Sequence, residues 1–342
     1  MPEGGLMERR ALLRAALSGF GAALVMPATG RAQQPTPDGA MTVTLLGTGS
    51  PSLNPARFGP ATLVQAGGLN LLFDAGRGCT VRLGQIGVPL GRIGGVFLTH
   101  FHSDHVNGLP DLWMTSYIPT PYAGRRAPLR LWGPTGAVRL AERVRSAFED
   151  DIRVRMADEN VPEAATAIEA HEFAESGGRV FEEAGVVVTA FPVNHGPLIH
   201  PSVGYRVDHA GRSVLLSGDT KYDENVIRHG TGVDLLLHEV CAIPAEVLRS
   251  APAAVAIAEH HTSPEEAGRV FAAARPRLAA YTHIVQRTRP PVPPVPLQQI
   301  EAETRSAYDG PLVVGQDLDR FVLADAGVRM QRWDTARQGY SD

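Results

Sequence analysis

The sequence predicts an α+β protein in which two mixed β-sheets stack face to face with helices on the outside. The first observation behind this prediction is the order of the segments, because two successive blocks each carry strand-like runs followed by helix-like ones. The second is the composition, since 44% hydrophobic and 20% charged residues with 36 glycines and 27 prolines suit a loop-rich globular protein. A chain of 342 residues with these values is neither disordered, collagen-like, a coiled coil nor a polytopic membrane protein.

The first 32 residues are typical of an export signal. Arg9 and Arg10 precede an apolar stretch at 15–26, and the small residues Gly30 and Ala32 suit the −3 and −1 positions of a cleavage site. This arrangement resembles a bacterial twin-arginine signal, which implies a periplasmic or secreted protein. The apolar stretch is shorter than the roughly 20 residues that span a bilayer, so we expect no stable membrane anchor after cleavage. The expected division of the chain is an export signal at 1–32, a linker at 33–40 and one folded domain at 41–342.

Replacing Arg9 and Arg10 together with lysine is expected to keep the precursor in the cytoplasm, because the paired arginines define this class of signal. The pathway carries folded cargo, so the protein would leave the cytoplasm already folded. Cell fractionation followed by an activity assay measures the effect. Periplasmic activity that stays unchanged in the double variant would contradict the signal.

The folded part is expected to begin at Met41 with a strand rich in β-branched residues. Strands of the first block are expected at 41–47, 61–65, 70–73, 96–99 and 129–132, and its helices at 79–86 and 135–148. Strands of the second block are expected at 186–191, 204–207, 213–216, 233–237, 278–281, 312–314 and 321–324, and its helices at 264–274 and 297–308. The charged segment 149–183 has weak periodicity and is expected to be an insertion with short elements of its own.

The stretch from Leu98 to His105 carries the strongest chemical signal. His100, His102, Asp104 and His105 come directly after an apolar strand. A strand end and the turn that follows it can aim several ligand atoms at one point, because alternate residues of an extended backbone share a face. Imidazole and carboxylate are ligands that first-row divalent metals accept. The stretch therefore predicts a metal site.

This stretch resembles the metallo-β-lactamase superfamily, whose core pattern is H-x-H-x-D-H at the end of a strand. The remaining blocks of the family pattern are matched, in order along the chain, by Asp74, His195, Asp219 and His283. The resemblance covers roughly residues 41–324. It implies an αββα sandwich and a hydrolase with a two-metal centre in a cleft at one edge of the sheets.

The resemblance also implies which residues hold the metals. One ion would take His100, His102 and His195, the other would take Asp104, His105 and His283, and Asp219 would bridge them. The ions are expected to be divalent, with zinc foremost and manganese or iron as alternatives. A hydroxide shared by the two ions would be the nucleophile, since metal binding lowers the pKa of water steeply. Asp74 would accept a hydrogen bond from a ligand histidine and fix its tautomer.

Within the superfamily, the chain resembles the tRNase Z, arylsulfatase-like and cyclic-phosphodiesterase-like branch. The familiar lactamases place a cysteine where this chain has Asp219, which disfavours β-lactam hydrolysis. The blocks typical of the branch are Gly47-Thr48-Gly49-Ser50-Pro51, Leu236-Leu237-His238-Glu239 and His261-Thr262-Ser263. In that branch a glutamate and a histidine deliver a proton to the leaving oxygen, and these roles would fall on Glu239 and His261. We count Asp104 with this pair as the catalytic residues.

The expected substrate is a small tetrahedral ester, either a phosphodiester or an aryl sulfate. The tRNA-processing members carry a long Gly-rich arm, whereas in this chain only the short span 196–218 joins His195 to Asp219. The formal charge of −4 and the predicted export add to an expectation that no nucleic acid is a partner. The alternatives are a lactone, thioester or β-lactam hydrolase, a tRNase Z-like ribonuclease, and a metal-binding protein without activity. A homodimer is compatible with the sequence.

Several further residues have two interpretations. His200 and Tyr205 could line the pocket, and Trp113, Met114 and Tyr117 could form an apolar wall, although packing in the core explains the aromatic residues as well. His238 and His260 lie beside the proposed acid pair and are more simply structural. Cys79 and Cys241 are most simply buried thiols, with a disulfide as the alternative in an oxidising compartment.

Overall fold

The structure is a computed structural model that describes residues 39–341. The predicted export signal and residues 33–38 of the predicted linker lie outside the described residues. Within the described part, no helix combines the length and the apolar character needed to cross a membrane.

Short strands and helices follow one another along the chain from Met41 to Ser341. The strands are β1 Met41–Gly47, β2 Ala61–Ala66, β3 Leu69–Phe73, β4 Gly95–Phe97, β5 Leu129–Pro134, β6 Ile168–Phe173, β7 Gly178–Glu183, β8 Val186–Pro192, β9 Val203–His209, β10 Arg212–Leu216, β11 Leu235–Cys241, β12 Leu278–Val285, β13 Leu312–Val314, β14 Arg320–Ala324, β15 Gly327–Asp334 and β16 Gly339–Ser341. The helices are α2 Cys79–Gln85, α3 Ser103–Val106, α4 Leu109–Tyr117, α5 Ala137–Ala147, α6 Glu149–Asp158, α7 Glu224–Gly230, α8 Ala245–Ser250, α9 Pro252–Ala258, α10 Pro264–Ala274 and α11 Leu297–Arg305, with 3₁₀ turns at Leu90–Arg92 and Glu163–Thr166.

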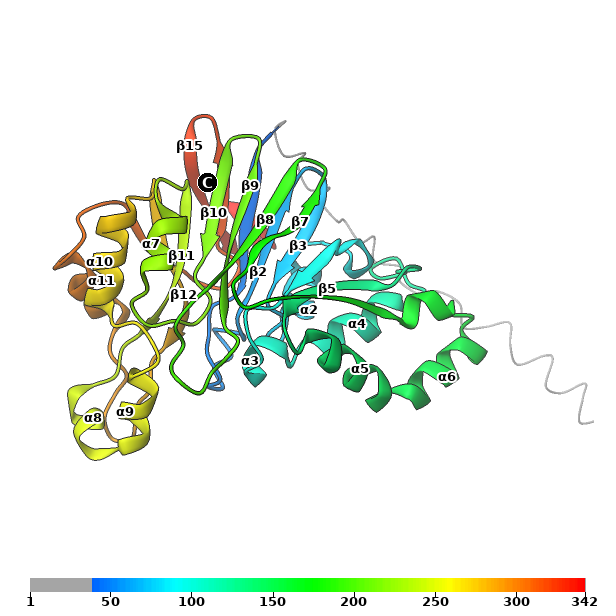
Figure 1. Cartoon of the computed structure of the whole chain (residues 1–342), viewed down its shortest axis with the longest axis horizontal. Helices are drawn as coiled ribbons and strands as arrows, with labels where there is room; N and C mark the ends of the chain where they lie inside the picture. The colour runs from blue at the N-terminus through cyan, green and yellow to red at the C-terminus, as the bar shows by residue number, and fades with distance from the viewer. Residues whose placement is uncertain (1–38, 342) are drawn as a thin grey trace, which may run out of the picture. The chain divides into compact units, whose positions relative to one another are not determined.

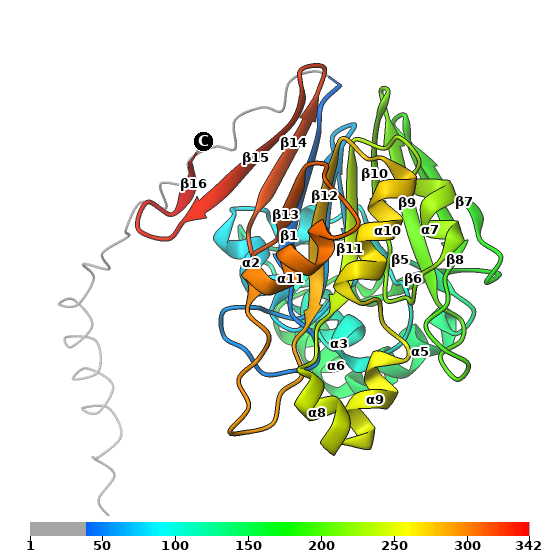
Figure 2. The same ribbon diagram turned by 90° about the vertical axis from the view of Figure 1, so that its left-hand side faces the viewer.

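Two sheets form the centre of the fold, as predicted. The first has nine strands in the order β16-β15-β14-β1-β2-β3-β4-β5-β6, and the second has seven in the order β13-β12-β11-β10-β9-β8-β7. Helices α2 and α5 contact the first sheet, and α7, α10 and α11 contact the second. Figure 1 shows the strands between these two groups of helices, which gives four layers in the order αββα. Figure 2 shows β15 and β16 extending the first sheet beyond β14.

Three apolar cores separate the four layers, and the alternation of side chains along each strand explains them. In β10, Val214 and Leu216 pack between the two sheets, whereas Leu215 packs under the outer helices. Successive side chains of a strand point to opposite faces, so a strand covered on both sides is apolar throughout. The first sheet behaves in the same way, with Leu71 facing the second sheet and Leu72 facing its own helices.

The segment 149–183 differs from the prediction of a separate insertion. It carries α6 and a 3₁₀ turn, and its two strands are integral to the sheets, β6 at the edge of the first and β7 at the edge of the second. The closing strand β14 also departs from the order of the two blocks, because it returns to the first sheet and pairs antiparallel with β1. The pairing of β5 with β6 and of β1 with β14 joins segments far apart in the chain, which local periodicity does not report.

The parallel parts of the two sheets fix where a site can form. Strands β3, β4, β5 and β6 are parallel in the first sheet, and β10, β11, β12 and β13 are parallel in the second. Parallel strands bring their carboxyl ends to one edge, where the loops that follow them form a crevice. Most of the residues that the sequence predicts as metal ligands lie at this end of β4, β10 and β12.

Candidate metal centre

The predicted metal ligands lie at the carboxyl ends of strands in both sheets. His100, His102, Asp104 and His105 lie between the end of β4 and the end of the short helix α3, and Asp219 follows β10. His195 follows β8, and His283 lies near the carboxyl end of strand β12. Residues from distant parts of the chain therefore converge because their strands end at one edge.

The backbone at two positions of the cluster takes a conformation that favours glycine or is strained for other residues. Gly218 has φ of +62°, and a Cβ there would lie 2.6 Å from the Val203 carbonyl oxygen, so only glycine lets Asp219 take its place. His283 has φ of +41°, which is uncommon for a residue with a side chain. The pairing of β11 with β12 shifts register at this point. Strain of this kind concentrates at functional sites.

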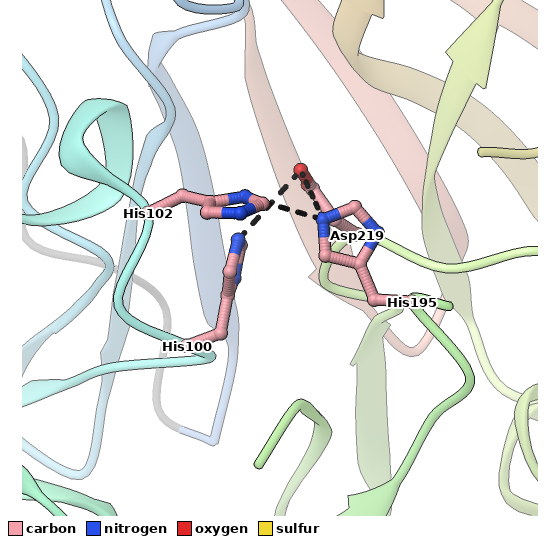
Figure 3. Close-up of side chains that lie close together, drawn as sticks. All are labelled: His100, His102, His195 and Asp219. Carbon is pink, nitrogen blue, oxygen red and sulfur yellow. Dashed lines mark hydrogen bonds and ion pairs between the residues drawn. The ribbon is translucent and has the colours of Figure 1, made fainter. Parts of the chain in front are cut away.

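A first group of ligand atoms comes from His100, His102, His195 and Asp219, which all lie within 4.8 Å of one another. Figure 3 shows these four side chains pointing toward one another from three separate loops. The Asp219 Oδ2 atom lies 3.9 Å from His100 Nε2 and 3.7 Å from His195 Nε2. The His195 Nε2 and His102 Nδ1 atoms are 3.3 Å apart.

A second group comes from Asp104, His105 and His283, again within 4.8 Å of one another. The same Asp219 Oδ2 atom lies 3.3 Å from His105 Nε2 and 3.2 Å from His283 Nε2. It therefore lies between the two groups, where the sequence predicted a bridging carboxylate. These two groups contain the seven residues that the family resemblance implied as ligands, and two further, overlapping groups join His195 to His260 and His261, and Asp219 to His261 and His283.

The donor atoms of this cluster fit divalent metal ions. His100 Nε2, His105 Nε2 and Asp219 Oδ1 are buried and have no hydrogen-bond partner among residues 39–341. Buried polar atoms without a partner are rare and call for an ion or water. Imidazole nitrogens with carboxylate oxygens are the donor set that zinc and related ions prefer.

The charge states of two of the ligand histidines suit metal binding, whereas burial of a third, His105, is outweighed by Asp219 and Asp74, which raise its pKa well above the usual value. Burial lowers the pKa of His100 well below its usual value and that of His195 to about 3, so both imidazoles are neutral, as metal ligation requires. Burial opposes ionisation of Asp219, but the nearby His283 and His105 outweigh it and lower the pKa of this carboxyl well below its usual value.

Hydrogen bonds from outside the cluster orient two ligand histidines. Asp74 Oδ2 accepts a hydrogen bond of 2.8 Å from His105 Nδ1, as predicted, and Asp74 Oδ1 accepts one from the Thr99 backbone N–H. His195 Nδ1 donates to the backbone carbonyl of His260 at 2.8 Å. Each bond leaves Nε2 of the histidine free for the cluster, since a neutral imidazole carries only one N–H.

Glu239 and His261 form the pair that the sequence predicted. The Glu239 carboxylate is fully buried and accepts a hydrogen bond of 2.9 Å from His261 Nδ1. Burial disfavours a charged imidazole, but the Glu239 carboxylate more than offsets it and raises the pKa of His261 to about 9. The His261 ring centre lies 5.0 Å from that of His195 and 5.6 Å from that of His283, so the pair borders the metal cluster.

Three of the other residues with two interpretations lie in the core. Tyr205 is fully buried and donates a hydrogen bond to the Leu98 carbonyl, and Trp113 and Tyr117 are also fully buried, so none of the three lines a pocket. His200 is exposed and pairs with Glu175. The two cysteines are separate, buried thiols.

The sequence did not predict the part played by the backbone of His260. Its carbonyl oxygen holds a metal-ligand candidate, His195, while the next residue, His261, is the candidate acid. One peptide thus links the cluster to the acid pair. A backbone acceptor has no side-chain signature, so no residue pattern could have revealed it.

Comparison with known proteins places the fold and the cluster in a class of metal-dependent hydrolases. Residues 69–284 match the family described as "Beta-lactamase superfamily domain". A ribonuclease Z of Mycobacterium bovis (strain BCG / Pasteur 1173P2) is 35% identical over 280 residues, which cover 81% of this chain and 96% of the relative. Among solved structures, the metallo-beta-lactamase fold protein YhfI from Bacillus subtilis has a TM-score of 0.64 at 17% identity, covering 83% of this chain and 99% of that one. Human tRNase Z, short form, has a TM-score of 0.60 at 23% identity, and the match covers 83% of this chain and 98% of that one. At sequence identities this low, the two structural matches show only that the fold is shared.

The chain belongs to the metallo-β-lactamase superfamily, in the branch that contains tRNase Z. The expectation that nucleic acid is not a partner was wrong, because it conflicts with ribonuclease Z relatives that match over 81% of this chain. The error has a physical reason. Net charge is a sum over the whole molecule, whereas contact with a polyanion depends on the few cations that surround the site.

Removing bound metal with a chelator should lower the melting temperature. An ion that binds only the folded state stabilises it by about 4 kcal/mol when its free concentration is a thousand times its Kd. Calorimetry of the chelated protein, before and after zinc is restored, measures the shift. An unchanged melting temperature in protein shown by elemental analysis to be metal-free would contradict a metal centre in this cluster.

Proposed function

We propose that the protein is a metal-dependent phosphodiesterase that cleaves RNA. The observation that carries the proposal is the position of the Glu239–His261 pair, at 2.9 Å, beside a cluster of seven candidate metal ligands. An acid pair next to such a cluster suits a substrate whose leaving group is an oxygen that needs a proton. The ribonuclease Z relatives at 35% identity favour RNA over the small esters that the sequence first indicated.

Divalent ions held by the cluster would supply Lewis acidity, which lowers the pKa of coordinated water and offsets charge that develops on the phosphoryl oxygens. The chain's own residues prepare the site for them. Asp219 is placed between the two groups of ligands by the turn at Gly218, and Asp74 and the His260 carbonyl fix the orientation of His105 and His195. Pre-organisation of this kind means that little rearrangement is needed during the reaction.

His261 is the candidate general acid. Its Nδ1 is held by Glu239, and its Nε2 has no hydrogen-bond partner in the described part of the chain. A water molecule loses one proton to solvent and its oxygen forms a new P–O bond, the P–O bond to the leaving oxygen breaks, and Nε2 delivers its proton to that leaving oxygen. Glu239 stabilises the imidazolium before transfer, and it is itself held by the backbone N–H groups of Thr220 and Thr262, each at 3.2 Å.

An activity panel tests the proposal. The metal-loaded protein would be assayed with a single-stranded RNA, bis(p-nitrophenyl) phosphate, cyclic AMP, p-nitrophenyl sulfate and a lactone. We expect cleavage of RNA, with the aryl phosphodiester as a slower surrogate. Hydrolysis of the sulfate or the lactone by a protein that leaves RNA intact would contradict the proposal. The substrate would then belong to one of the other ester classes.

A further inference from the structure

The loops that carry the metal-ligand candidates also carry cations. Arg77 follows β3 and Arg287 follows β12, and both side chains are exposed. Lys221, the only lysine in the sequence, follows β10 and is half-buried. Since β3, β10 and β12 all run toward the metal cluster, the three cations lie beyond the same carboxyl edge as the cluster itself.

Backbone contacts tie each of these loops to the site. Lys221 donates its backbone N–H to the Asn194 carbonyl at 2.8 Å, next to the ligand His195. Arg77 follows Gly76, where a Cβ would lie 2.6 Å from the Asp104 carbonyl oxygen, so this loop packs closely on the ligand loop.

The third loop leaves β12 at Val285, which is paired in register with Cys241 of β11. Arg287 follows two residues later, and four residues after the ligand candidate His283.

None of the three cations has an acidic partner in the described part of the chain. Elsewhere arginines commonly form ion pairs, as Arg82 does with Asp317 and Arg130 with Glu183. Asp223 is the first acidic residue after Lys221 in the sequence. Its carboxylate already accepts hydrogen bonds from the backbone N–H groups of Asn194 and Asn225 and thereby caps α7. Cations left unpaired beside a site are available to an anionic ligand.

We infer that Arg77, Lys221 and Arg287 form a phosphate-binding rim that holds the backbone of an RNA substrate on either side of the scissile phosphodiester. This inference rests on the proposed function and adds to it how the substrate is held. Phosphate contacts position a nucleic acid without reading its sequence, so the rim would act on single-stranded RNA of any sequence. The rim would also provide contacts to RNA that the short span between His195 and Asp219 does not provide.

Alanine variants of the three cations test the rim in the metal-loaded enzyme. The kcat/KM of a labelled single-stranded RNA would be measured over a range of salt concentrations, in parallel with that of bis(p-nitrophenyl) phosphate. The slope of log(kcat/KM) against log salt is negative, and each lost phosphate contact should make it less steep by about 0.7. The triple variant should lose on the order of tenfold more activity toward RNA than toward the small diester at low salt.

Arg275→Ala is the matched control, because Arg275 is exposed, has no acidic partner among residues 39–341 and precedes β12 at the opposite end from Arg287. It should leave both activities and the salt slope unchanged. A second readout is the RNA affinity of the zinc-loaded His261→Ala protein, measured by fluorescence anisotropy with and without the rim substitutions.

The outcomes separate the rim from the proposed function. If the wild-type enzyme cleaves RNA but the rim variants match Arg275→Ala in salt slope and affinity, the rim is wrong and the function stands. If the wild-type enzyme cleaves bis(p-nitrophenyl) phosphate and neither cleaves nor binds RNA, the proposed function fails and the rim fails with it.

Discussion

Replacing Asp219 with alanine should remove most of the bound metal and reduce activity by more than about a hundredfold. The reason is geometric, since one oxygen of Asp219 lies 3.2 Å from His283 Nε2 and 3.7 Å from His195 Nε2 and so serves both groups of ligands. His283→Ala should spare the first group and retain more metal than Asp219→Ala. Elemental analysis of the purified variants measures the difference.

Asp309→Ala serves as the control for this comparison, because Asp309 is an exposed aspartate outside the cluster. It should keep its metal and its activity. Two full equivalents of metal in Asp219→Ala would rule out the bridging role. Equal metal loss in Asp219→Ala and His283→Ala would show that the carboxylate serves only one group.

His261→Ala should impair cleavage of substrates with poor leaving groups far more than cleavage of those with good ones. General-acid assistance contributes roughly a hundredfold to ten-thousandfold where the leaving oxygen needs a proton, and little for p-nitrophenolate. A series of phosphodiesters with leaving groups of increasing pKa measures this. The plot of log rate against leaving-group pKa should be steeper for the variant than for the wild type.

Glu239→Gln is the matched companion, because it keeps the shape of the side chain and removes the charge that raises the pKa of His261. It should steepen the same plot by less than His261→Ala does. Metal content should stay unchanged in both variants, since neither residue is a proposed ligand. Equal losses across the whole series, or loss of metal, would show that His261 is structural or a ligand.

Much of the fold could be predicted because buried strands and capped helices have clear local signals. The helix expected at 264–274 has the bounds of α10, which begins with Ser263 and Glu266 in a reciprocal capping box. Strands at or next to a sheet edge, such as β6 and β15, were missed, because their side chains are partly exposed and do not alternate cleanly. Strand β11 was predicted to end at Leu237, but it continues through His238 and Glu239, which the site buries.

The side chains of the candidate site could be predicted because each belongs to a short pattern at the end of a strand. What could not be predicted was how backbone groups hold them. The His260 carbonyl that orients His195 and the Thr99 N–H that holds Asp74 leave no trace in residue identity. The expectation about nucleic acid was wrong for a related reason, because an overall charge of −4 does not report where individual cations such as Arg77, Lys221 and Arg287 lie.

Titration of the metal-free protein with zinc, followed by cleavage of a labelled single-stranded RNA, tests the central claim most directly. Cleavage should be absent without metal, appear as zinc binds, and reach its maximum at about two equivalents, since the cluster provides two groups of ligands around Asp219. RNA left uncut at two bound equivalents, or cut equally well by the metal-free protein, would contradict a metal-dependent phosphodiesterase that acts on RNA.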